Sequence, residues 1–96
     1  MAGFVQIIEY RTSRFDDVMA LGNQYRDAAG SLARHILATE NRDKPGTYMT
    51  IVEFDSYESA MENSKLPETQ AAAEKYMALA DVPPVFYDLD VLEDRA

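Results

Sequence analysis

The strongest constraint on the fold of this chain is the stretch 47–81, where an apolar strand leads through a turn into a helix that a proline interrupts. Residues 48–54 (YMTIVEF) are rich in β-branched and aromatic side chains, which is typical of a strand. Apolar side chains fall on both of its sides, Met49 and Ile51 on one and Tyr48, Val52 and Phe54 on the other. Because side chains alternate across a strand, something is expected to cover both faces.

The helical part of this stretch has predictable ends. Ser56 can cap the helix, although Ser59 replaces the Glu of a complete capping box. Pro67 cannot donate a helical hydrogen bond, so it divides the stretch into two helices and suits the first turn of the second. The expected packing faces are Tyr57, Ala60, Met61 and Ser64 in the first helix, and Ala72, Ala73, Tyr76, Met77 and Ala80 in the second.

The rest of the chain adds three strands and one helix. We expect strands over 4–10, 32–40 and 85–92, and a helix that follows Thr12 or Ser13. The order is strand, helix, strand, strand, interrupted helix, strand, which is the ferredoxin-like pattern. The predicted fold is therefore α+β, with a four-stranded antiparallel sheet and helices on one face. Ninety-six residues predict a single domain over 1–96.

The turn at 41–46 (NRDKPG) predicts a hairpin between the second and third strands. Its length suggests that Arg34 lies near Glu53 and His35 near Val52. If that face of the sheet looks at the helices, His35, Tyr48 and Thr50 would be polar points in an apolar pocket.

The other face of the sheet remains substantially apolar, and a chain of this length supplies no third layer. We therefore expect a homodimer that packs sheet face against sheet face about a two-fold axis.

Composition excludes several partners and chemistries. A formal net charge of −8 argues against nucleic acid and anionic membranes as partners. The chain has no Cys, one His and no Gly-rich phosphate loop, so thiol chemistry and a transition-metal site are not expected. Asp88 and Asp90 on one strand face are read as a solvated edge rather than a cation site. No signal peptide or membrane-length apolar run is visible, and we expect a cytoplasmic protein.

The chain resembles the antibiotic biosynthesis monooxygenase-like group of dimeric α+β barrel proteins. The resemblance is sharpest over 48–69: an apolar strand that ends in Phe54, the turn Asp55-Ser56, and a helix with the small residue Ala60. Asn63 stands where the family often has His, and Pro67 matches. Glu68 and Thr69 replace the family's His and aromatic residue.

This resemblance implies a homodimer with one pocket per subunit between helices and sheet. Some relatives oxidise aromatic quinols or polyphenols with O2 and no bound cofactor, because the electron-rich substrate itself activates oxygen. Others degrade haem with a helical His ligand and a nearby Trp. This chain has no Trp, and Asn63 replaces that His, so the haem reaction is not expected.

Five residues are candidates for such a site. His35 is the only histidine, and imidazole is the side chain best suited to act as a general base near neutral pH. Tyr25, Tyr48, Asn63 and Tyr76 are candidate substrate-binding residues. Structural interpretations are also open. His35 can be hydrogen-bonded in the core or at the dimer seam, Tyr25 and Tyr76 can be core residues, and Asn63 can cap the helix break. At the level of function, the alternatives to an oxygenase are a non-catalytic binding or accessory dimer, and a dimerisation module whose pocket is closed.

Overall fold

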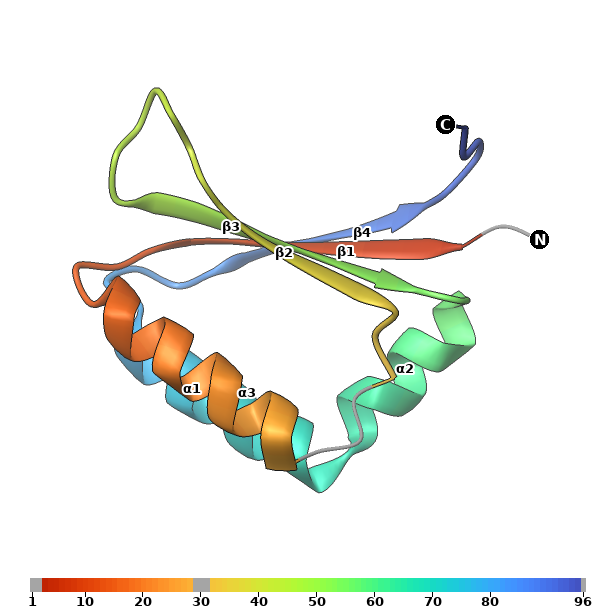
Figure 1. Ribbon diagram of the computed structural model, residues 1–96, viewed down its shortest axis with the longest axis horizontal. Helices are drawn as coiled ribbons and strands as arrows, with labels where there is room; N and C mark the ends of the chain where they lie inside the picture. Colours follow the sequence, from red (N-terminus) through yellow and green to blue (C-terminus); the bar gives the residue numbers. More distant parts are fainter. Residues whose placement is uncertain (1–2, 29–31, 96) are drawn as a thin grey trace.

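The computed structural model describes residues 3–28 and 32–95, except for the side chains of 25–28. These residues form four strands and three helices (Figure 1). In chain order the elements are β1 (Phe4–Arg11), α1 (Phe15–Ala28), β2 (His35–Glu40), β3 (Thr47–Phe54), α2 (Tyr57–Lys65), α3 (Pro67–Leu79) and β4 (Val85–Asp90).

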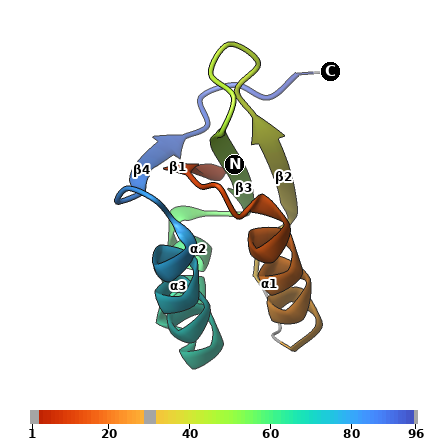
Figure 2. The ribbon, with the colours of Figure 1, turned by 90° about the vertical axis from the view of Figure 1, so that its left-hand side faces the viewer.

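The strands form one sheet in the order β2-β3-β1-β4, with every neighbouring pair antiparallel. All three helices lie on the same side of this sheet, and α1 and α3 run alongside each other (Figures 1 and 2). This arrangement confirms the predicted ferredoxin-like α+β fold. None of the helices in the described ranges is long and apolar enough to cross a membrane.

The two helix boundaries predicted after β3 are confirmed. The Ser56 side chain accepts a hydrogen bond from the Ser59 backbone N–H at 3.1 Å and so caps α2. Leu66 has an extended backbone with φ −64° and ψ 135°, and Pro67 begins α3 directly after it. The chain therefore turns between α2 and α3 where the proline predicts it.

The hairpin between β2 and β3 is closed by a turn that needs glycine. Gly46 has φ +87°, a left-handed conformation that side chains rarely adopt. Asn41 donates its backbone N–H to the Thr47 carbonyl at 2.8 Å, and its side chain accepts from the Asp43 N–H at 2.9 Å. Together these contacts place Glu40 opposite Tyr48 at the start of the paired region.

The predicted register of this hairpin is wrong by one residue. His35 pairs with Glu53, and Ile36 pairs with Val52, because the turn holds one residue more than the loop length suggested. A shift of one residue moves every side chain of a strand to the other face. The shift therefore decides which side of the sheet His35 occupies.

Pairing and alternation define two sides of the sheet. The helix-facing side carries Tyr48, whose ring stacks on Phe15 of α1 at a centroid distance of 4.3 Å. We call the opposite side the open face. The open face carries Val5, Ile7 and Glu9 of β1, His35, Leu37 and Thr39 of β2, Met49, Ile51 and Glu53 of β3, and Val85, Tyr87 and Leu89 of β4.

The core of the described chain is small. Phe4, Phe54 and Ala60 form its central cluster, and Val18 and Ala72 are also buried. No large side chain among the described residues is less than 2% exposed. The predicted packing face of α3 is only partly right, since Ala72 is buried whereas Ala73 is exposed and Met77 is 55% exposed. Helices cover the sheet incompletely, so the monomer leaves much apolar surface in water.

Candidate functional site

Three aromatic rings meet on the helix-facing side of the sheet, where β1 and β3 lie next to the start of α1. Tyr10 and Tyr48 are directly paired across the two strands, and their ring centroids lie 5.6 Å apart. Phe15, the first residue of α1, stacks on Tyr48 with an interplanar angle of 13°. We call these three residues the aromatic stack. All three side chains are partly exposed to solvent.

The start of α1 is held in this position by a buried threonine. Thr12 is 4% exposed, and its hydroxyl donates to the Leu79 carbonyl at 2.7 Å. The same hydroxyl accepts from the Arg14 backbone N–H at 2.9 Å. Since Leu79 ends α3, one side chain fixes the end of β1 to both helices and places Phe15 over the sheet.

Polar groups surround the aromatic stack. Thr50, one strand repeat from Tyr48 on the same side of the sheet, hydrogen-bonds to the Tyr10 side chain. Glu40, paired with Tyr48 across the hairpin, accepts a hydrogen bond from the Tyr48 hydroxyl. Asp16 of α1 adds a second carboxylate to the field at Tyr48. The arrangement combines apolar ring faces with two phenol groups, a hydroxyl and two carboxylates.

These surroundings set the protonation of both tyrosines. Burial raises the pKa of Tyr10 above its ordinary value. The Thr50 hydrogen bond favours the phenolate and lowers this pKa in part, whereas the neighbouring Tyr48 raises it. Partial burial also raises the pKa of Tyr48, and the charge and hydrogen bond of Glu40 and the charge of Asp16 act in the same direction. Both residues are therefore neutral phenols near pH 7, suited to donating hydrogen bonds rather than to accepting a proton.

His35 lies on the opposite side of the sheet. It projects from β2 on the open face, with Glu53 as its cross-strand partner, whereas Tyr48 and Thr50 belong to the helix-facing side. The expected grouping of His35 with Tyr48 and Thr50 is wrong for this reason. Its role as a general base remains a prediction, which this position does not favour.

The remaining predicted site residues are held in other contacts or lie outside the described part. The Asn63 side-chain oxygen accepts a hydrogen bond from the Leu32 backbone N–H at 3.0 Å, which ties α2 to the segment before β2. The Tyr76 hydroxyl lies 3.1 Å from the place where a Cβ on Gly22 would stand, between α3 and α1. The side chain of Tyr25 is outside the described residues. Their roles in substrate binding remain predictions.

Reasoning from the sequence missed Tyr10, Phe15 and Glu40. A signal for Tyr10 was present, because it alternates with Phe4, Gln6 and Ile8 on one strand face. The ferredoxin-like order also places the first and third strands side by side. Combining the two observations would have paired Tyr10 with Tyr48.

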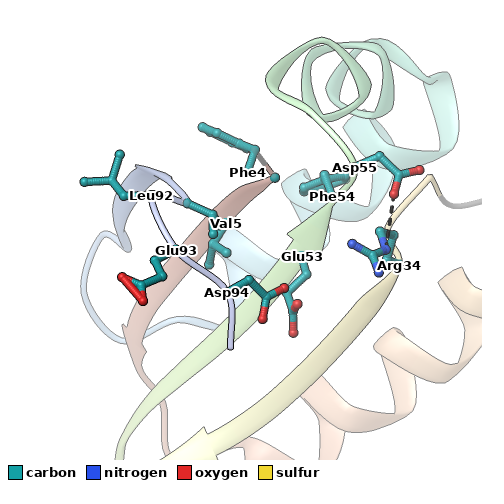
Figure 3. A pocket seen from close by; sticks show the side chains of 11 residues that line it. Phe4, Val5, Arg34, Glu53, Phe54, Asp55, Leu92, Glu93 and Asp94 are labelled. Atoms are coloured by element: carbon teal, nitrogen blue, oxygen red, sulfur yellow. Dashed lines mark ion pairs between the residues drawn. The ribbon is translucent and has the colours of Figure 1, made fainter. Parts of the chain in front are cut away.

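A separate cavity of about 300 Å³ lies at the far end of the sheet. Glu53 and Val5 on the open face line it together with the segment after β4, which contributes Glu93 and Asp94 (Figure 3). Arg34 also lines it and forms an ion pair with Asp55 at 3.2 Å. Within residues 3–28 and 32–95, no three His, Asp or Glu side chains cluster in a way that could hold a metal ion.

The comparisons with known proteins find structural similarity but no sequence match. No family model matches the sequence, and no curated protein matches it. A conserved protein from Methanosarcina mazei superimposes with a TM-score of 0.81 at 8% identity, over 93% of this chain and 92% of that one.

Two further structures carry functional names. A Deinococcus radiodurans protein, named as a candidate antibiotic biosynthesis monooxygenase, has a TM-score of 0.77 at 12% identity, over 97% of this chain and 96% of that one. SnoaB, a cofactor-independent oxygenase from Streptomyces nogalater, has a TM-score of 0.76 at 12% identity, over 96% of this chain and 95% of that one. The chain therefore has the fold of the antibiotic biosynthesis monooxygenase-like proteins, as its sequence resemblance predicts.

Proposed function

We propose that this protein is a small-molecule enzyme of the cofactor-independent oxygenase type, which oxidises an electron-rich phenol or quinol with O2. The aromatic stack carries this proposal, because it presents ring faces beside two neutral phenol donors. Planar aromatic compounds bind well to such faces, and hydrogen bonds from the two hydroxyls orient a substrate oxygen. The fold shared with SnoaB supports the same class of reaction.

The reaction balances without a bound redox group. A phenol with a free para carbon reacts with one O2 to give a quinone and one water. One oxygen atom forms the new C=O bond, the other leaves as water with the phenolic and the para protons, and the substrate supplies all four electrons. The protein has to bind the substrate, favour its ionisation and hold it where O2 can approach.

The chain's own residues fit these tasks. Tyr10 and Tyr48 donate hydrogen bonds to the oxygen on which negative charge develops, which favours the phenolate form of the substrate. Glu40, whose charge acts on the Tyr48 phenol, is the carboxylate that takes the released proton.

Oxygen consumption with a panel of hydroquinones, naphthols and fused-ring phenols tests this proposal. Tyr48→Phe keeps the ring stack but removes the donor, and we expect a fall in kcat of tenfold or more. Tyr57→Phe is the matched control, since it deletes the same group from a half-exposed ring that packs edge-on against Phe4 in the core. Wild-type activity in Tyr48→Phe would overturn the role of the Tyr48 hydroxyl, and no oxygen uptake with any phenol would overturn the oxygenase proposal.

The second candidate is a non-catalytic binding or accessory protein of the same fold. The small core and the partly exposed aromatic stack favour it as well, since both are compatible with ligand binding alone. Thermal unfolding against the same panel separates the two functions. A ligand that raises Tm without consuming oxygen would establish binding without catalysis.

We also propose that the protein is a homodimer joined through the open face. This face exposes large apolar side chains: Leu37 is 45% exposed, Val85 49%, Tyr87 41% and Leu89 44%. The small core of the described chain leaves little other stabilisation, and all three described helices lie on the other side of the sheet. A second copy covers the face with a surface of the same shape and composition. Sedimentation that shows only monomer at micromolar concentration would overturn this assembly.

A further inference from the structure

One corner of the open face is polar, whereas the middle of the face is apolar. Its middle row runs across all four strands and contains only Leu37, Ile51, Ile7 and Tyr87. The next row toward the end of β3 contains His35 and Glu53 on adjacent strands, directly opposite each other. Cβ atoms of directly opposite residues lie about 5 Å apart, so the imidazole and the carboxylate are within reach of each other.

Other charges near this corner are mostly negative. Glu53 shares the end-of-sheet cavity with Glu93 and Asp94, and the Asp94 side chain lies next to that of Glu53 (Figure 3). Arg34 lies beside His35 in the chain, but its guanidinium is paired with Asp55 at 3.2 Å. Glu9 lies farther along the open face and accepts from the Tyr87 hydroxyl at 2.9 Å. Among these neighbours, a protonated His35 is therefore the group that balances the negative charge of Glu53.

We infer that protonation of His35 strengthens the association of two copies through the open face, which makes the dimer sensitive to pH. This inference rests on the proposed dimer. When the face is covered, Glu53 loses water. With neutral His35 its charge is then uncompensated, whereas with protonated His35 the two side chains form an ion pair. Burying an unpaired carboxylate costs much more than burying a paired one.

The pH window follows from composition. Histidine ordinarily titrates near pH 6.5, and the chain has one histidine and no cysteine. The α-amino group also changes charge between pH 6 and 8, so the part of a pH effect that His35→Gln abolishes is the part that reports on His35. Association takes up at most one proton at each His35, and the dimer is therefore tighter at pH 6 than at pH 8. Because both protomers carry the pair, the effect of pH enters Kd twice.

Sedimentation equilibrium at pH 6.0 and 8.0, at constant ionic strength, tests this inference on the full chain. Wild type is expected to have a Kd at least tenfold lower at the acidic pH. His35→Gln removes the titrating group, and its Kd should be the same at both values. Glu53→Gln should associate more tightly than wild type at pH 8.0, with the pH effect lost or reversed.

Glu62→Gln is the matched control, because Glu62 is exposed on α2, which lies on the other side of the sheet. It makes the same change in net charge and should keep the wild-type pH effect. A wild-type dimer with equal Kd at both pH values, or a Glu53→Gln variant that keeps the wild-type effect, overturns the inference and leaves the dimer standing. Monomer at both pH values overturns the dimer as well.

Discussion

Removal of the Thr12 hydroxyl should destabilise the protein. The hydroxyl is buried, donates to Leu79 and accepts from Arg14. Thr12→Val preserves the shape of the side chain but leaves a carbonyl and an N–H without that partner. One net hydrogen bond contributes about 1 kcal/mol, and an unsatisfied buried group costs about 1–3 kcal/mol, so the free energy of unfolding should fall by about 2 kcal/mol.

Urea and thermal unfolding at one fixed protein concentration measure this loss, because association would make Tm depend on concentration. For a domain of this size, about 2 kcal/mol corresponds to a fall in Tm of about 8–16 °C. Thr12→Ser is the control, since it keeps the hydroxyl and loses one methyl group, which costs about 1 kcal/mol. A Thr12→Val protein that is as stable as wild type, or more stable than Thr12→Ser, would refute the reasoning.

Two other predictions test contacts elsewhere in the chain. Gly22→Ala should raise the free energy of unfolding by up to about 1 kcal/mol in a Tyr76→Phe background, because alanine favours the helix. In the wild type the gain should be smaller, because the new Cβ would stand 3.1 Å from the Tyr76 hydroxyl. Equal effects in the two backgrounds of a double-mutant cycle would contradict this prediction. The hydrogen bond and charge of Glu9 raise the pKa of Tyr87 in the folded protein. Folding therefore favours the protonated phenol, and the free energy of unfolding should fall as the pH rises above about 10. Glu9→Gln should lower the pH at which the Tyr87 phenolate absorbance appears in a difference titration against Tyr87→Phe, and an unchanged midpoint would contradict the assignment.

Much of the fold could be predicted because its signals are local. Ser56 caps α2 and Pro67 starts α3 through contacts within a few residues, which do not depend on the rest of the molecule. The order of elements then limits the topology to very few choices. The hairpin register could not be predicted in the same way. Loop length alone does not show that Gly46 adopts a left-handed conformation and adds a residue to the turn.

The candidate site was predicted much less well than the fold. Tyr48 was identified, but its partners Tyr10 and Phe15 are 38 and 33 residues away in sequence, and only strand pairing and helix placement bring them together. Asn63 is engaged by a backbone N–H from a segment 31 residues earlier, a contact with no local signal. His35 was a reasonable candidate by chemistry, yet its side of the sheet depends on the register.

The sequence by itself therefore determined the elements, their order and the surplus of apolar surface, since hydrophobic periodicity and the special backbone preferences of proline and glycine act within one element. Tertiary structure alone decided which side chains share a face, because a single-residue shift in pairing exchanges the two sides of a strand. Pairing of β1 with β3 and the placement of α1 gather Tyr10, Tyr48 and Phe15 on the helix-facing side, whereas the hairpin register leaves His35 with Glu53 on the open face.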